Sequence, residues 1–230
     1  MILYRIMENI EELNYKIIKE KRRSYSLKFD YKGVLLIKIP TNYRVNPEEI
    51  IKKHSSWIKK HHYVKKEKSF ISGEKFLYLG KYYELKLQPN VKNKVDLKDY
   101  LLVDSSIEKE RIEKYIESWY RDEARGYITD RVRNFADDME VLYDNIRITS
   151  AKSRWGSCSK IFKKDSNNLN FTWRLIMIPP QIIDYVIVHE LAHIFEMNHS
   201  KKFWRIVERF CPDYKNRRRW LRENGKRAYL

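Results

Sequence analysis

Three residues in the C-terminal half of the chain stand at a spacing that suits metal chemistry: His189, Glu190 and His193. On a helix, side chains four residues apart lie on one face, about one turn from each other. Both imidazoles can therefore bind one metal ion, and Zn²⁺ is the usual choice. Glu190 can reach the water on that ion and accept its proton as the water attacks a carbonyl.

A third ligand has two candidates. A straight helix would carry His199 about 15 Å along the axis from His189, too far for one ion, so the chain must turn between them. Asn198 tolerates the left-handed backbone that ends helices, and Ser200 suits the N-cap of a following helix. His199 is therefore the preferred ligand, with the carboxylate of Glu208 as the alternative. Three protein ligands and one open position are typical of a catalytic zinc site.

The stretch around the histidines predicts a mostly buried helix. Pro179 and Pro180 suit its start, because proline is tolerated in the first helical turn. Apolar residues then give the helix broad apolar coverage: Ile182, Ile183, Val186, Ile187, Leu191 and Ile194. The alternative interpretation is that His189 and His193 are hydrogen-bonded histidines of a core helix that holds no metal.

The remaining elements indicate an α+β fold in two parts. Residues 1–104 predict a β-rich part with one basic helix over about 46–66, opened by Asn46 as N-cap. Residues 105–230 predict the metal-binding part, with a long helix over about 107–139, then a β-hairpin, the histidine helix and C-terminal helices.

Several other residues near the predicted site have more than one possible role. The hairpin can align an extended peptide by adding it to a sheet edge, and Gly156 allows close backbone approach there. Arg154 is a candidate to bind a substrate carboxylate or to stabilise an oxyanion, and Tyr214 is a second oxyanion candidate. Arg154 can equally be an ordinary surface arginine. Glu196 can hold an imidazole in place or be a solvated residue of the last turn.

Charge and composition suggest an environment and a kind of partner. The chain has 48 Lys+Arg against 31 Asp+Glu, a net charge of +17. This favours an anionic partner, nucleic acid first, although basic residues spread along the whole chain also suit a lysine-covered surface. Two cysteines, no secretory signal and no apolar run near the 18 or so residues of a membrane span predict a soluble cytoplasmic protein without a membrane partner. The sequence does not fix the oligomeric state.

Several motifs together resemble the YgjP-like metallopeptidase family, which is related to SprT-like and wider zincin proteases. They are Arg154–Ser159, Asp184–His193, Asn198–Ser200 and Phe203–Trp204, in the family's order and spacing, and the likeness extends over about 15–221.

The resemblance implies a zincin-like catalytic core with a β-rich N-terminal part. It implies one zinc ion held by His189, His193 and His199, with Glu190 as the base. Metzincins share the interval from the second to the third histidine but have glycine where this chain has Glu196. The turn before the third ligand must therefore be built differently here.

The leading hypothesis is a zinc metallopeptidase that cleaves a peptide or protein substrate through a metal-activated water, with Glu190 as general base. The first alternative is a nucleic-acid-binding protein whose zinc site is structural or vestigial. A second combines the two as a DNA-associated protease, since SprT-like relatives include proteases that act on proteins trapped on DNA. A metal-dependent amidase of small molecules is the remaining enzyme alternative. Ligand type alone leaves Mn²⁺, Co²⁺ or Ni²⁺ open as the native metal.

Overall fold

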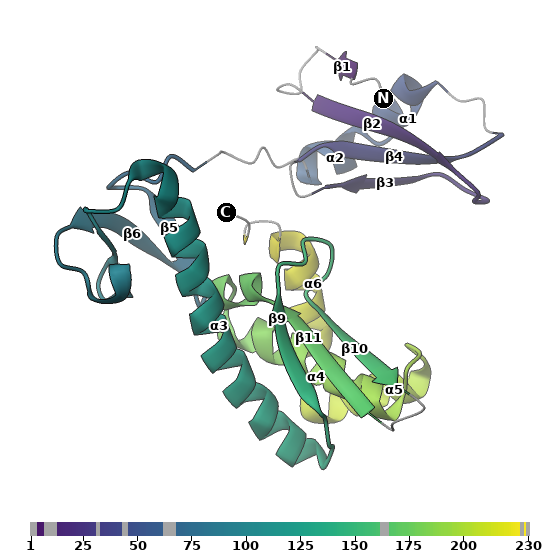
Figure 1. The fold of residues 1–230 in the computed structure, drawn as a ribbon. Coiled ribbons are helices and arrows are strands. Elements are labelled where there is room, and N and C mark those ends of the chain that lie inside the picture. The colour runs from purple at the N-terminus through teal and green to yellow at the C-terminus, as the bar shows by residue number, and fades with distance from the viewer. Residues whose placement is uncertain are drawn as a thin grey trace. The chain divides into compact units, whose positions relative to one another are not determined.

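The computed structural model of the chain describes residues 4–6, 13–30, 33–42, 46–61, 68–161, 166–225 and 228. It confirms a mixed α+β fold (Figure 1). The chain forms two compact units, Met1–Glu67 and Lys68–Leu230.

The first unit has its own core under a four-stranded sheet of order β1-β2-β4-β3. The strands are β1 (Tyr4–Ile6), β2 (Leu13–Glu20), β3 (Ser26–Phe29) and β4 (Leu35–Pro40). Burial alternates along β4, so that Leu35 and Ile37 are fully buried, as expected of a strand with one face on a core. The predicted basic helix opens at Asn46, whose side chain accepts a hydrogen bond from the Glu48 N–H at 3.0 Å.

The structure divides that basic helix into two short helices. The division lies at His54, whose backbone (φ −107°, ψ 18°) caps α1 (Pro47–Lys53) and separates it from α2 (Ser55–His61). Residues 62–66 of the predicted helix lie outside the described residues.

The second unit begins with a four-stranded sheet of order β5-β6-β8-β7. Its strands are β5 (Lys75–Tyr78), β6 (Lys81–Gln88), β7 (Val95–Leu97) and β8 (Leu101–Asp104), with the short 3-10 helix η1 (Lys92–Lys94) before β7. The sequence placed these strands in the N-terminal part, but they pack on the long helix α3 (Lys109–Met139). Two hydrogen bonds of 2.6 Å join β5 to α3, from the Tyr120 hydroxyl to the Leu77 carbonyl and from the Tyr78 hydroxyl to Glu123.

A three-stranded sheet and the histidine helix complete the second unit. The sheet has the order β10-β11-β9, from β9 (Asn145–Thr149), β10 (Gly156–Ile161) and β11 (Ser166–Thr172). After the 3-10 helix η3 (Trp173–Met177) come α4 (Pro180–Phe195), α5 (Lys201–Phe210) and α6 (Tyr214–Asn224). Leu169 and Phe171 of β11 are fully buried in the core, while α4 contacts both β10 and α3.

Helix α4 is anchored near its start by two contacts. Arg131 of α3 forms a bidentate ion pair with Asp184, with N–O distances of 2.8 and 2.7 Å. The turn between β5 and β6 donates the Leu79 N–H to the Ile176 carbonyl at 2.7 Å, just before α4 begins. These contacts fix the helix that carries the histidines.

The β5–β6 turn gives a stability prediction. Leu79 (φ 47°) and Gly80 (φ 78°) both have left-handed backbone, as is typical of a tight two-residue hairpin turn. A Cβ on Gly80 would also lie 3.0 Å from Pro179 Cα, whereas Gly73 (φ 92°) has nothing within 4 Å. Gly80→Ala is therefore expected to lower the free energy of unfolding by about 1–3 kcal/mol more than Gly73→Ala. Urea unfolding of both variants measures this difference, and equal losses would contradict the clash.

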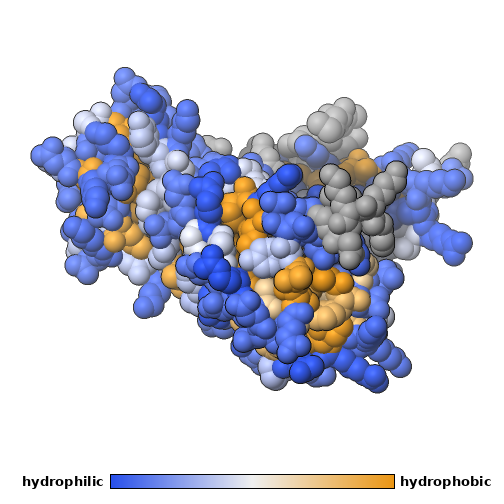
Figure 2. Space-filling model, turned by 60° about the horizontal axis from the view of Figure 1, so that its bottom comes forward, coloured by the Kyte–Doolittle hydropathy of each residue, from blue (hydrophilic) through white to orange (hydrophobic). Residues whose placement is uncertain are grey.

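No helix in the described part of the chain is long and apolar enough to cross a membrane. Figure 2 shows hydrophilic residues over most of one face, interrupted by local apolar patches. The exposed large apolar side chains of the second unit include Phe195 and Met197, which flank the turn after α4. Apolar surface is therefore available next to the histidines.

Candidate metal centre

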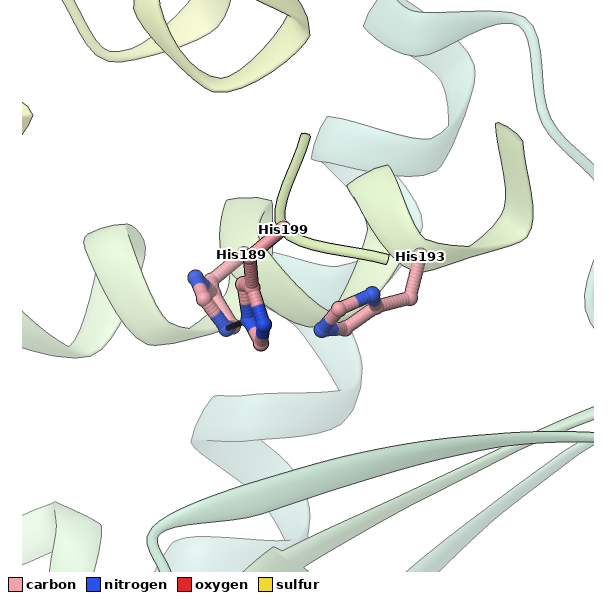
Figure 3. Close-up of side chains that lie close together, drawn as sticks. All are labelled: His189, His193 and His199. Carbon is pink, nitrogen blue, oxygen red and sulfur yellow. Dashed lines mark hydrogen bonds between the residues drawn. The ribbon is translucent and has the colours of Figure 1, made fainter. Parts of the chain in front are cut away.

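Two helices and the turn between them bring three histidines together. His189 and His193 lie one turn apart on α4, and His199 lies in the turn before α5 (Figure 3). One nitrogen of each ring lies within 4.8 Å of the others, a spacing that can hold a metal ion. The Nε2 atoms of His189 and His199 are 3.0 Å apart. The structure thus brings together the three residues that the sequence predicts as ligands.

The turn that returns His199 lies where the sequence predicts it but is built differently. The predicted left-handed Asn198 is wrong, since Asn198 does not have positive φ. Instead, α4 stops because Glu196 takes an extended backbone (φ −145°, ψ 107°). The predicted cap of α5 is confirmed, with the Ser200 hydroxyl accepting the Phe203 N–H at 3.3 Å.

Glu196 contacts a histidine through its backbone. The Nδ1 of His193 lies 3.1 Å from the Glu196 carbonyl, so Nδ1–H donates to it and Nε2 is left to bind a metal. The Glu196 carboxylate instead accepts the Asn198 N–H at 3.3 Å. The extended residue that ends α4 therefore also orients the second histidine.

The surroundings of the histidines favour their neutral, metal-binding form. Burial, with the neighbouring His193, His199 and Arg218, lowers the pKa of His189 to about 3. Burial also lowers the pKa of His193. Neutral imidazole is the form that coordinates a metal, so this donor set fits zinc.

Glu190 is buried against the edge strand β10. A Cβ on Gly156 would lie 2.7 Å from both Cγ and Oε1 of Glu190, so only glycine leaves room for this carboxylate. Burial raises the pKa of Glu190 to about 7, although the Cys158 backbone N–H, which donates to the carboxylate, and the charge of Arg154 oppose the rise. A carboxylate in these surroundings is suited to accepting a proton near neutral pH.

A cavity of about 160 Å³ opens beside the glutamate and the first histidine. Its lining comes from β10, α4 and α6, with the residue before β10: Trp155, Gly156, Tyr185, Val186, His189, Glu190 and Leu221. A larger hollow of about 440 Å³ is lined by residues of the three-stranded sheet and the segments next to its strands, including Thr149, Ser157, Asn170 and Thr172. Of these two cavities, the smaller includes His189 in its lining and the larger includes no histidine of the cluster.

The other predicted site residues lie around this centre. Arg154 is exposed, lines the larger hollow and lies close enough to Glu190 for its charge to affect that group. Tyr214 is buried and stacks with ring centroids 5.2 Å apart on Trp204, the tryptophan that stacks on His199. Glu208 forms an ion pair with Lys215 at 3.8 Å and is not part of the histidine cluster.

Two residues near the site make contacts that the sequence does not predict. Gly156 accommodates Glu190, and Arg218 of α6 lies over the Trp204 ring with Cζ 4.8 Å from its centroid. Trp204 in turn stacks on His199, with ring centroids 5.7 Å apart. The only sequence signal for Arg218 is a run of basic residues before Trp220, which suggests nucleic acid.

Comparison with known proteins identifies the family. The model described as "YgjP-like, metallopeptidase domain" matches residues 23–224. No curated protein matches the chain. Among solved structures, the metallopeptidase zymogen of Pyrococcus abyssi abylysin is 21% identical with a TM-score of 0.34, covering 43% of this chain and 95% of that one. With its family model spanning most of its length, the chain belongs to the YgjP-like metallopeptidase family.

Proposed function

We propose that this metallopeptidase holds one zinc ion with His189, His193 and His199 and uses Glu190 as general base. The observation that carries the proposal is the convergence of three imidazoles beside a buried carboxylate. When bound, zinc supplies a Lewis acid that polarises a carbonyl and acidifies water. Three imidazoles leave room for substrate in a tetrahedral site.

Glu190 performs the proton transfers in this mechanism. Its carboxylate accepts the proton of the attacking water and then passes it to the amine of the leaving group. The Cys158 N–H and the Gly156 backbone fix the carboxylate in place. Burial lowers the dielectric around the carboxylate and thereby strengthens its electrostatic interactions.

The edge of the three-stranded sheet supports a peptide as substrate. Strand β10 lies at the edge of the order β10-β11-β9 and packs on α4. The Cys158 N–H donates to Glu190, so the open edge of β10 faces the glutamate. An extended peptide added along this edge would pass beside the proposed base. A hairpin followed by the histidine helix and two further helices supports a zincin-like core.

Metal content and hydrolysis test the proposal together. Purified wild-type protein is expected to contain about one zinc per chain by elemental mass spectrometry and to degrade unfolded casein. His193→Ala is expected to lose both the zinc and the activity, and circular dichroism checks that it is folded. Folded wild-type protein that binds no zinc, or that binds zinc and cleaves no unfolded protein, would overturn the proposal.

A further inference from the structure

We propose that the 160 Å³ cavity beside Glu190 is a subsite for a residue that bears a carboxylate, and that Arg218 is its specificity-determining residue. This inference rests on the proposed function, since it names the substrate chemistry of the same site. It concerns which peptide is accepted, and it leaves the roles of the histidines and of Glu190 unchanged.

The position of the cavity decides which part of the substrate it receives. Glu190 forms part of the cavity wall, and the same carboxylate passes a proton to the leaving amine. The nitrogen of that amine must therefore lie within hydrogen-bond reach of this wall. The residue that contributes the nitrogen follows the cleaved bond, so its side chain is the one that enters the cavity.

The walls of the cavity are mainly apolar and aromatic. Trp155, Val186 and Leu221 line it, with the ring of Tyr185 one helical turn before His189. These apolar and aromatic walls suit the aliphatic stem of a side chain but offer no positive charge that would select an acidic residue among side chains of similar size. Discrimination between them needs a polar group at the opening.

Arg218 provides a charge close to this cavity. It lies on α6 one turn before Leu221 and therefore on the same side of that helix. Its guanidinium rests on Trp204, whose ring centroid is 5.8 Å from that of His189. The ring of Tyr185, another wall residue, lies next to that of His189, with centroids 5.9 Å apart. The guanidinium therefore lies near the side of the cavity that His189 and Leu221 form.

Arg218 has no acidic partner in the part of the chain that the structure describes. Its neighbour Arg217 pairs with Asp213 at 2.8 Å, and Arg131 pairs with Asp184, whereas no described carboxylate lies within ion-pair distance of Arg218. Stacking on Trp204 holds the guanidinium plane and leaves its edge N–H groups able to donate. A planar fork of donors matches the two oxygens of a carboxylate. That carboxylate can be an acidic side chain or the free C-terminus of a peptide.

Binding of zinc-directed probes tests the subsite without any need for catalysis. The probes are three short peptidyl hydroxamates that differ in the residue next to the zinc-binding group and in the C-terminus. The first has Glu and an amidated C-terminus. The second has Gln and an amidated C-terminus, and the third has Gln and a free C-terminus. Their affinities for the zinc-loaded full chain are measured by calorimetry. Wild-type protein is expected to bind at least one carboxylate probe about tenfold more tightly than the amidated Gln probe.

The variants and the salt dependence assign that preference. Arg218→Gln is expected to reduce the ratio of affinities to about one, whereas Arg219→Gln, at the exposed neighbouring position, retains it. Because Arg218 is exposed, added salt should reduce the ratio in the wild type. The probe that is favoured identifies the source of the carboxylate as side chain or chain end.

The outcomes separate this inference from the proposed function. Equal affinities in the wild type, no binding of any probe by the zinc-loaded chain, or a preference that persists in Arg218→Gln would overturn the subsite. If the protein hydrolyses casein but binds all three probes equally, the proposed subsite is contradicted and the proposed function is not. If the zinc-loaded protein prefers carboxylate probes through Arg218 but cleaves no substrate, the subsite is supported and the proposed peptidase activity is contradicted.

Discussion

Glu190→Gln is expected to reduce kcat/KM for unfolded casein by about 10²–10⁴-fold while zinc stays bound. Glutamine has nearly the shape of glutamate, so it fills the same space against Gly156. It cannot accept a proton from water, and the substitution leaves the three clustered histidines unchanged. Hydrolysis rates and zinc content measured on the same preparation give both halves of the result.

Glu208→Gln is the matched control for this prediction. Glu208 is exposed and pairs only with Lys215 among the described ion pairs, so this variant should keep its zinc and its activity. The same variant tests Glu208 as the alternative third ligand. If Glu208→Gln loses zinc and His199→Ala retains it, Glu208 is the third ligand instead of His199. Unchanged hydrolysis in Glu190→Gln would remove Glu190 from its role.

Local patterns predicted the elements that position the site. The helix α4 follows from apolar coverage and a proline start, and the cap of α5 follows from Ser200. These features depend on residues close in sequence, which periodicity and capping chemistry describe well. The prediction for Asn198 was wrong, because the helix does not end in left-handed backbone. The extended backbone of Glu196 ends α4 instead.

The division of the chain depends on contacts between distant segments. The strands over 75–104 resemble those before them in pattern, so the sequence placed them together. Packing on α3 joins them to the second unit instead, through contacts such as that of Tyr120 with Leu77, which are 43 residues apart. No local pattern encodes which core a strand will join.

The cluster of three histidines could be predicted from the sequence, but the residues that support it could not. His189 and His193 have a spacing that is itself a signal, whereas Gly156 and Arg218 come from other elements. The sequence suggested close backbone approach at Gly156, with a substrate as the neighbour. In the structure the neighbour is the chain's own Glu190.

Gly156→Ala is expected to reduce kcat/KM by about 10²-fold or more and to leave zinc bound. The new Cβ would lie 2.7 Å from Cγ and Oε1 of Glu190, closer than such atoms approach, so the carboxylate must move. A displacement of about 1 Å in a catalytic group can cost about 10²-fold in rate. Gly126→Ala, where nothing lies within 4 Å of an added Cβ, is the control and should stay active.

A double-mutant cycle shows whether Gly156→Ala acts through the glutamate. In a Glu190→Gln background the catalytic carboxylate is already gone, so adding Gly156→Ala should bring little further loss of activity. In a Glu190→Ala background the clashing Cγ and Oε1 atoms are absent, so Gly156→Ala should cost less stability there than in the wild type. Equal stability losses in both backgrounds would mean that Gly156 supports the fold of β10 and does not act by making room for Glu190.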